Sequence, residues 1–372
     1  MAKGIYVGID NIARKVKKAY VGVENKARKI KKGYIGVGGI ARPCYSSEVK
    51  LDYYGSGADL SIGRYDLAAA RAGNYVLFGG GRTKSDVSAA VDTYTSTLTK
   101  GTAGDLSVAR YGLAAASVGE YALFSCGNTS TTTCENATDA YNSSLVKVSI
   151  ENPTDSKGDL ASTTVGNYAL FAGGENHNTY YSIVHTYSSS LVIGTATGLS
   201  EARDDLAATT IGGYALFGGG NGANSYSSVV DAYNNSLVKG TVTNLSKARY
   251  SLAATTVGDY ALFGGGSGFG TIVDTYTSSL VKGTATELSE AKSSLAATTV
   301  GDYALFGGGY RNSFLATVDT YTSSLVKGTA TNISVARSGL AAITLGNYAM
   351  FGGGGISYSN GSAAVDIYQL VG

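Results

Sequence analysis

The stretch DYALFGGG at residues Asp259–Gly266 is repeated without change at residues Asp302–Gly309. Five near-copies share its form: a tyrosine, an apolar run, and a stop at small residues that are mostly glycine. The seven tyrosines stand 43 to 47 residues apart, at Tyr75, Tyr121, Tyr168, Tyr214, Tyr260, Tyr303 and Tyr348. Seven repeat units of about 45 residues therefore cover residues 58–372.

Each unit contains four short predicted strands. In the fifth unit these are SLAATTVG (Ser251–Gly258), DYALF from Asp259, TIVDTYT (Thr271–Thr277) and LVKGTAT (Leu280–Thr286). Glycine, asparagine and serine residues that favour turns separate them, and no window has a helical period. Seven four-stranded units of this length predict an all-β fold, a seven-bladed β-propeller.

The glycine run has a physical explanation in such a fold. A blade packs between two neighbours, so both faces of its inner strands are buried, which suits a continuous apolar run. Glycines after Phe263 would let the chain leave the sheet with a positive φ and let the adjacent blade approach closely. Two units depart from the rule, with Ser125-Cys126-Gly127 and Ala172-Gly173-Gly174.

The body resembles the kelch family of β-propellers. The resemblance rests on the glycine run after strand two, the tyrosine of strand three and the basic residue before strand one, and it covers residues 45–372. The kelch tryptophan is missing, since the chain contains none. A leucine follows the strand-three turn instead, at Leu98, Leu145, Leu191, Leu237, Leu280 and Leu325.

The last unit lacks a fourth strand, because the chain ends AVDIYQLVG. The segment SSEVK at Ser46–Lys50 matches the SSLVK that begins strand four in other units. We therefore expect residues 45–60 to supply the missing outer strand of blade seven and so to remove a bare sheet edge. The predicted domains are a segment of residues 1–44 and a propeller of residues 45–372.

Residues 1–44 differ from the body in charge. They carry eleven Lys/Arg and two acidic residues, a net charge of +9, whereas residues 45–372 carry a net charge of −7. Tyrosines recur every fourteen residues, at Tyr6, Tyr20 and Tyr34, each followed by a turn pair and a basic stretch. This pattern predicts three small hairpins, which bury little by themselves and need a partner or self-association.

This basic segment resembles the tandem Tyr-x-Gly…Ala-Arg-Lys repeats at the start of tail-associated proteins of phages and prophages of Gram-positive bacteria. The resemblance implies a location in the virion tail and docking of residues 1–44 on a virion tail or baseplate protein, with a homo-oligomer as a further option. A basic arm that binds nucleic acid is the alternative. We favour docking, because regular hairpins suit it better than a phosphate-binding tail.

Several classes of protein find little support. Unbroken apolar runs reach only about five residues, which excludes membrane insertion, and no secretory signal is visible. Nucleophile-elbow, P-loop and zinc-protease motifs are absent, so we expect no enzyme activity, cofactor or metal. A glycan hydrolase needs only two carboxylates, and the non-repeated acids Asp86, Glu135, Glu175 and Asp204 keep that alternative open.

Cysteines and histidines leave three options open. Cys126 and Cys134 flank one loop of the second unit, and His177 and His185 lie in the third. The two cysteines could be free thiols, a hairpin disulfide or, with the histidines, ligands of zinc, in that order of preference. Cys44 follows Pro43 at the predicted domain junction.

A repeated charge pattern accompanies the strands. A cation precedes strand one of every unit, at Arg64, Arg110, Lys157, Arg203, Arg249, Lys292 and Arg337. Strand three carries Asp92, Asp139, Asp231, Asp274, Asp319 and Asp366, with His185 in the third unit. Residues repeated in every blade usually serve the blade itself, so we expect structural ion pairs or turn-capping contacts. A cationic ring for acidic glycans is the alternative.

The loops between strands two and three differ in every unit, although antiparallel order puts all seven on one face. They are rich in Tyr, Asn, Ser and Gly, a composition that suits adaptable recognition. We expect a ligand to bind there, chiefly across blades three to six, through Tyr180, Tyr181, Tyr226, Phe269, Tyr310, Arg311 and Phe314.

Together these patterns favour a non-enzymatic, tail-associated phage or prophage protein whose propeller recognises a host-surface glycan or protein. A cell-wall polysaccharide hydrolase on the same particle and an intracellular protein-interaction propeller are the alternatives.

Overall fold

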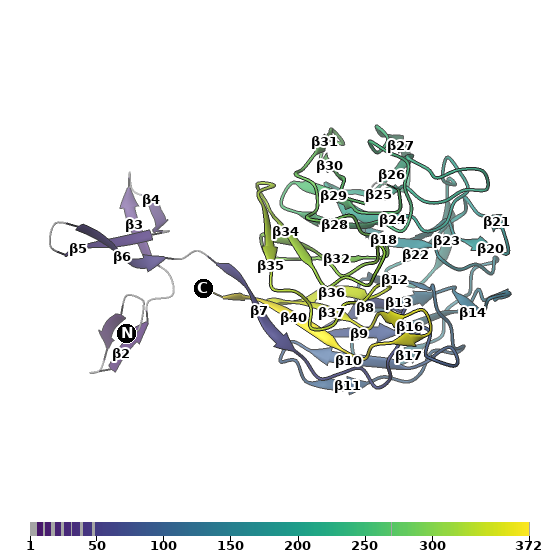
Figure 1. Ribbon diagram of the computed structural model, residues 1–372, viewed down its shortest axis with the longest axis horizontal. Coiled ribbons are helices and arrows are strands. Elements are labelled where there is room, and N and C mark those ends of the chain that lie inside the picture. The colour runs from purple at the N-terminus through teal and green to yellow at the C-terminus, as the bar shows by residue number, and fades with distance from the viewer. Residues whose placement is uncertain are drawn as a thin grey trace. The chain divides into compact units, whose positions relative to one another are not determined.

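Seven antiparallel sheets of four strands each follow one another along the chain in the computed structural model. It describes residues 49–268 and 270–371 in full, and within residues 1–48 the backbone of six strands. The first strand of each sheet contacts the first strand of the next, and β36 contacts β8, so the sheets form a closed ring. The fold is the predicted seven-bladed β-propeller (Figure 1).

Strand one of each blade lies nearest the axis. These strands are β8 (Ala68–Ala72), β12 (Ala114–Val118), β18 (Ala161–Val165), β24 (Ala207–Ile211), β28 (Ala253–Val257), β32 (Ala296–Val300) and β36 (Ala341–Leu345). Threonine hydroxyls bond across neighbouring blades here, for example Thr209 to Thr256 at 2.9 Å. Small and hydroxylated side chains therefore suit the narrow space where the blades converge.

Strand two is the most deeply buried strand. These strands are β9 (Tyr75–Gly79), β13 (Tyr121–Ser125), β19 (Tyr168–Ala172), β25 (Tyr214–Gly218), β29 (Tyr260–Gly264), β33 (Tyr303–Gly307) and β37 (Tyr348–Gly352). In each of them all residues after the tyrosine are buried, which confirms that both faces are covered.

Strand three pairs with strand two. These strands are β10 (Val91–Thr95), β16 (Thr138–Tyr141), β22 (Val184–Ser188), β26 (Val230–Asn234), β30 (Val273–Thr277), β34 (Val318–Thr322) and β40 (Val365–Val371). Its tyrosine packs edge-on against the phenylalanine of strand two, as Tyr276 does on Phe263 with ring centroids 5.8 Å apart. The Tyr276 hydroxyl donates to the Thr243 carbonyl at 2.8 Å and so fixes the segment that enters the blade.

Strand four forms the outer rim of the ring. These strands are β11 (Lys100–Thr102), β17 (Lys147–Val148), β23 (Ile193–Ala196), β27 (Lys239–Thr241), β31 (Lys282–Thr284), β35 (Lys327–Ala330) and β7 (Lys50–Ser56). Except for β7, these strands are shorter than the predicted LVKGTAT stretch, and Leu280 and its equivalents belong to the preceding turn. Leu280 has a φ of 61°, outside the strand region.

Blade seven is completed by a strand from the start of the body. The strand order of its sheet is β36, β37, β40 and β7, so the predicted closure is confirmed. The Tyr53 hydroxyl donates to the Asp366 carboxylate at 2.5 Å, which joins the first and last strands of the body. The preceding hairpin strand β6 extends to Ser46, so the first two residues of the predicted closing segment belong to that hairpin.

Three blades add a small hairpin in the loop between strands two and three. These are β14 (Asn128–Ser130) with β15 (Thr133–Cys134), β20 (Glu175–Asn176) with β21 (Thr179–Tyr180), and β38 (Gly355–Ser357) with β39 (Asn360–Gly361). They extend the variable loops of blades two, three and seven.

The basic segment contains the three predicted hairpins. They are β1 (Tyr6–Ile9) with β2 (Ile12–Lys15), β3 (Ala19–Val23) with β4 (Lys26–Ile30), and β5 (Lys32–Val37) with β6 (Ile40–Ser46). Their predicted turn residues lie outside the described residues, as does the side chain of Cys44. By its contacts the chain divides into residues 1–52 with 370–372, and residues 53–369.

The glycine run has the two uses that the sequence predicts. A Cβ on Gly264, at the end of β29, would lie 2.8 Å from the Phe306 ring of the next blade, so this glycine permits the close approach. Gly266 has a φ of 105°, which side-chain-bearing residues rarely adopt, and turns the chain out of the sheet.

Candidate functional site

The variable loops share one face of the propeller with the segments that precede strand one; we call it the loop face. The two segments of a blade are joined there by short antiparallel bridges. In blade one, Tyr65 and Arg82 exchange backbone hydrogen bonds of 3.0 and 2.7 Å. Equivalent bridges join Tyr111 to Asn128, Gly158 to Glu175, Asp204 to Asn221, Ser293 to Tyr310, and Ser338 to Gly355. The loop face is thus a rigid frame around the axis.

A ring of seven residues surrounds the axis just before strand one. Each has a positive φ between 49° and 60°, and each N–H donates to the carbonyl of the preceding member over 2.7–2.9 Å. The bond from Asp66 to the Gly339 carbonyl, 2.8 Å, closes the circle. We call this the axial ring: Asp66, Gly112, Asp159, Asp205, Ser251, Ser294 and Gly339.

The axial ring opens into a cavity of about 290 Å³. Besides the ring it is lined by the seven leucines that follow, namely Leu67, Leu113, Leu160, Leu206, Leu252, Leu295 and Leu340. Three carboxylates, those of Asp66, Asp159 and Asp205, therefore line this cavity together with the leucines, and most of its accessible surface is polar. Glycines make room for them, since a Cβ on Gly112 would lie 2.4 Å from an Asp159 carboxylate oxygen.

The axial carboxylates resist ionisation. Burial, with repulsion from Asp205, raises the pKa of Asp66 to about 7. The same two causes raise the pKa of neighbouring Asp204 to about 7. Burial also raises the pKa of Asp159 and of Asp205. Carboxyl groups with raised pKa values are candidate acid–base groups.

Aromatic side chains gather on the loop face where blades six, seven and one meet. Tyr310 and Phe314 of blade six have ring centroids 5.3 Å apart, and both rings face Tyr358 of blade seven at 6.1 and 6.3 Å. The hydroxyls of Tyr310 and Tyr358 are 2.6 Å apart. Tyr358 is nonetheless 83% exposed, whereas Tyr310 and Phe314 are half-buried, so the cluster presents chiefly the Tyr358 ring to solvent.

The cluster continues onto blades one and two. The Tyr65 hydroxyl lies 3.4 Å from the Tyr358 carbonyl oxygen, to which it donates. The Arg82 guanidinium lies over the ring of Tyr65 at 5.9 Å and over that of Tyr111 at 4.5 Å. We call the series an aromatic strip, formed by Phe314, Tyr310, Tyr358, Tyr65 and Tyr111.

The other predicted ligand residues are dispersed. Tyr180 accepts a bond from Asn221 at 3.2 Å, and the Tyr181 ring lies 5.7 Å from the ammonium of Lys157. Tyr226, 48% exposed, packs against Tyr250 at 4.6 Å. Arg311 is exposed beside Tyr310 and lines a small groove between blades five and six. Phe269 lies outside the described residues.

The repeated cations and acids form buried ion pairs. Each lies within 2.6–2.9 Å: Arg64–Asp92, Arg110–Asp139, Arg203–Asp231, Arg249–Asp274, Lys292–Asp319 and Arg337–Asp366. Both partners are at most 2% exposed, so these cations cannot form a surface ring for glycans. They tie the segment entering each blade to its third strand.

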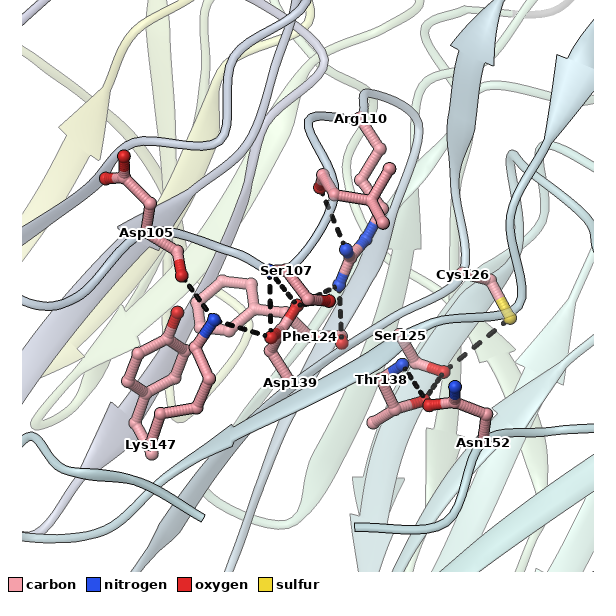
Figure 2. A network of polar contacts seen from close by, with 12 residues as sticks. Asp105, Ser107, Arg110, Phe124, Ser125, Cys126, Thr138, Asp139, Lys147 and Asn152 are labelled. Carbon is pink, nitrogen blue, oxygen red and sulfur yellow. Dashed lines mark hydrogen bonds and ion pairs between the residues drawn. The ribbon is translucent and has the colours of Figure 1, made fainter. Parts of the chain in front are cut away.

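Figure 2 shows one such pair in blade two. The Asp139 carboxylate accepts from Arg110 at 2.8 Å, from Lys147 at 2.9 Å and from the backbone and hydroxyl of Ser107. Arg110 also donates to the Phe124 carbonyl at 3.1 Å. Burial opposes the charge on Asp139, but the two cations and these bonds hold the pKa of the carboxyl below its usual range.

Blade three replaces this network. His185 stands at the aspartate position and its ring nitrogen lies 3.1 Å from the Asp155 carboxylate, whereas Ile193 replaces the rim lysine. Lys157 is fully buried, and its ammonium has no hydrogen-bond partner within the described residues. Burial lowers the pKa of Lys157 and of His185.

The two described cysteines are free thiols rather than a disulfide. Cys126 is buried, and burial raises the pKa of its thiol. The Cys134 thiol lies 3.0 Å from a side-chain oxygen of Asn128, to which it donates. Within the described part of the chain, no group of three or more His, Cys, Asp or Glu side chains could hold a metal ion.

Sequence reasoning had not assigned Tyr65, Tyr111, Asp66, Asp159 or Asp205 to a site. Each lies one or two residues after the repeated cation, at a position that varies between blades. A cation and a leucine recur in every blade, whereas the residues between them vary. This variation is the sequence signal that could have marked these positions as part of a site.

The chain matches no known protein-family model and no curated protein. The described residues contain no helix that is long and apolar enough to cross a membrane. The structure shows a repeat protein, a seven-bladed β-propeller.

Proposed function

We propose that the propeller is a non-enzymatic binding module of a phage or prophage tail, and that its loop face holds a host-surface glycan. The observation that carries this proposal is the aromatic strip. Tyrosine and phenylalanine rings supply flat apolar area at low entropic cost, and sugar rings stack on such faces. Neighbouring Asn, Ser and Thr groups of the variable loops suit sugar hydroxyls.

The strip crosses four consecutive blades, six, seven, one and two, rather than blades three to six. An extended face of this kind suits several units of a chain-like ligand better than one small molecule. Single stacking contacts are weak, so one copy should bind at roughly millimolar to micromolar strength. Many copies on one particle would convert weak binding into firm attachment through effective concentration.

Residues 1–44 would anchor the module to a tail or baseplate protein. The net charge of +9 and the three small hairpins support this assignment, because such hairpins need a partner to bury a face. A homo-oligomer formed through the same segment would serve the same purpose, since it also multiplies the loop faces.

The test replaces the exposed aromatic cluster. Tyr310→Ala, Phe314→Ala and Tyr358→Ala together should abolish binding to host cell-wall preparations while the melting temperature stays nearly unchanged. The control is Tyr54→Ala, which removes an exposed tyrosine, at 52%, that lies outside the strip. Binding that survives the triple change but is lost on altering Arg71 and Glu120, which line the opposite face, would refute the assignment of the loop face.

A second candidate function rests on the axial carboxylates. Hydrolysis of a glycosidic bond needs a protonated carboxyl and an ionised one. Asp204 is 8% exposed, and one of its carboxylate oxygens lacks a hydrogen-bond partner among the described residues. It directly precedes Asp205 of the axial ring, and burial with repulsion from Asp205 raises its pKa. Release of reducing ends from host polysaccharide, lost in Asp205→Asn, would favour a hydrolase. Binding without release favours the adhesion module.

A further inference from the structure

The end of the aromatic strip on blades one and two is a groove with its own chemistry. Its volume is about 360 Å³, and it is formed by the variable loops of blades one and two and by the tip of the variable loop of blade seven. Tyr65, Tyr111 and Tyr358 contribute aromatic surface. The charged residues of its lining are Arg82, Lys84 and Asp86.

Arg82 is held in place without an ion pair. Its backbone exchanges two hydrogen bonds with Tyr65, and its guanidinium lies over two tyrosine rings. Among the described residues no carboxylate oxygen lies within 4.0 Å of the guanidinium, and it donates no side-chain hydrogen bond. The other arginine of blade one, Arg64, differs, because it donates to both Asp92 and the Phe78 carbonyl. The guanidinium N–H groups of Arg82 are therefore free to donate to a ligand.

The stacking prepares these donors for a planar anion. Two flanking rings restrict the guanidinium, so little rotamer entropy remains to be lost when it binds. A guanidinium presents parallel N–H groups that match a carboxylate or a phosphate in a bidentate way. The Arg82 side chain is only partly buried, so a ligand in the groove can reach it.

The surrounding charges favour an anion at this position. Two cations and one carboxylate give the groove lining a net charge of +1, whereas residues 45–372 as a whole carry −7. The Asp86 carboxylate already accepts the Val87 N–H at 2.8 Å. Asp66 of the axial ring also faces Arg82 electrostatically, but no ion pair forms between them.

We propose that this groove binds the anionic group of an acidic saccharide, with Arg82 as the bidentate donor to a carboxylate or phosphate and exposed Tyr358 as the stacking face for the adjoining sugar ring. The proposal rests on the proposed glycan-binding function and narrows its ligand class to acidic saccharides. Tyr65 and Tyr111 act as positioning residues for Arg82, because its guanidinium lies over both rings.

The experiment compares saccharides that differ only in charge. Full-length protein is titrated calorimetrically with oligogalacturonate and with its neutral methyl ester, and in a second arm with a phosphorylated mannan and the dephosphorylated mannan. Wild type should bind at least one acidic form roughly tenfold more tightly than its neutral partner. The arm that shows the preference identifies the carboxylate or the phosphate as the source of the charge.

Arg82→Gln should erase the preference and leave binding of the neutral forms in place. Arg82→Lys, which keeps the charge but loses the bidentate geometry, should retain only part of it. Arg71→Gln, an exposed arginine on the opposite face, is the matched control for loss of one positive charge and should behave as wild type. Unchanged melting temperatures verify that the variants are folded.

Two results would overturn the inference while the proposed function stands: wild type binds acidic and neutral forms equally, or Arg82→Gln keeps the preference. Failure of wild type to bind any saccharide, neutral or acidic, would instead refute the glycan-binding function itself, and this inference with it.

Discussion

The third glycine of the repeated run offers a sharp test of how the blades are built. It is present in all seven blades, at Gly81, Gly127, Gly174, Gly220, Gly266, Gly309 and Gly354, and its φ lies between 98° and 118°. At Gly266 a Cβ would stand 3.0 Å from the Tyr250 carbonyl oxygen and 3.1 Å from Leu252 Cβ. Both the backbone conformation and the space therefore disfavour a side chain.

The first glycine of the run is under a weaker constraint. A Cβ on Gly264 would lie 2.8 Å from Phe306 Cε1, but its φ is not in the positive region and the obstacle is a side chain. Two blades already have a Cβ there, at Ser125 and Ala172. A substitution at Gly264 should therefore be tolerated better than one at Gly266.

The expected magnitudes follow from these contacts. For Gly266→Ala, a strained backbone costs about 1–3 kcal/mol and overpacking about 1–3 kcal/mol, so we expect a loss near 3 kcal/mol. For Gly264→Ala, overpacking is partly offset by about 0.5–1 kcal/mol gained when alanine replaces glycine in a strand. We expect a loss near 1 kcal/mol there, and thus a difference of about 2 kcal/mol.

Equilibrium unfolding in urea, followed by tyrosine fluorescence, measures both losses through the shift in midpoint at constant slope. Ala172→Gly is the matched control and should change the midpoint by less than Gly266→Ala does. Equal losses at Gly264 and Gly266, or a neutral Gly266→Ala, would refute the reasoning from φ.

Three further predictions concern charge and closure. Asp274→Asn leaves Arg249 buried without its counter-ion and should cost about 3–5 kcal/mol in urea unfolding, whereas Asp86→Asn on an exposed loop should cost under about 0.5 kcal/mol; similar small losses would contradict a structural role for the pair. Burial raises the pKa of Asp66 to about 7, above its value of about 3.9 in the unfolded chain, so the folded state binds the extra proton and stability falls as pH rises from about 4 to 7. The melting temperature of Asp66→Asn should therefore exceed that of wild type by an amount that grows between pH 5 and 7. A difference that stays constant with pH would contradict the raised pKa of Asp66. Removal of residues 1–48 should leave a folded body, whereas removal of residues 1–56 deletes β7, exposes the edge of β40 and should cause aggregation in size-exclusion chromatography; identical behaviour of the two truncations would show that β7 is dispensable.

The sequence by itself determined the architecture of the body. A local pattern of strand and turn residues repeats seven times, and each copy needs only its neighbours to bury both faces, so the number of blades and the order of strands follow from the repeat. The missing fourth strand of the last unit and the SSEVK match near the start of the body predicted the closure that β7 provides. The three hairpins of the basic segment could also be predicted from the sequence, because each hairpin pairs strands that are adjacent in the chain.

The pairing of Arg249 with Asp274 was expected because such a cation and aspartate recur in six of the seven blades, but how deeply the pair is buried was not. Sequence spacing shows which residues recur, whereas only packing shows that both side chains are fully buried. The sequence also showed His185 in place of the aspartate in blade three, but only the structure shows that His185 pairs with Asp155 and that, among the described residues, the buried Lys157 ammonium has no hydrogen-bond partner.

The candidate site was decided by the tertiary structure. Tyr65 and Tyr358 lie at opposite ends of the body sequence and meet because the ring closes between blades seven and one. Asp66 and Asp159 belong to different blades and share one rim because each precedes the strand of its blade that lies nearest the axis. A repeat pattern describes contacts between adjacent copies. It does not show which variable residues of distant copies meet when the ring closes. These variable residues form the surface that is available to a ligand.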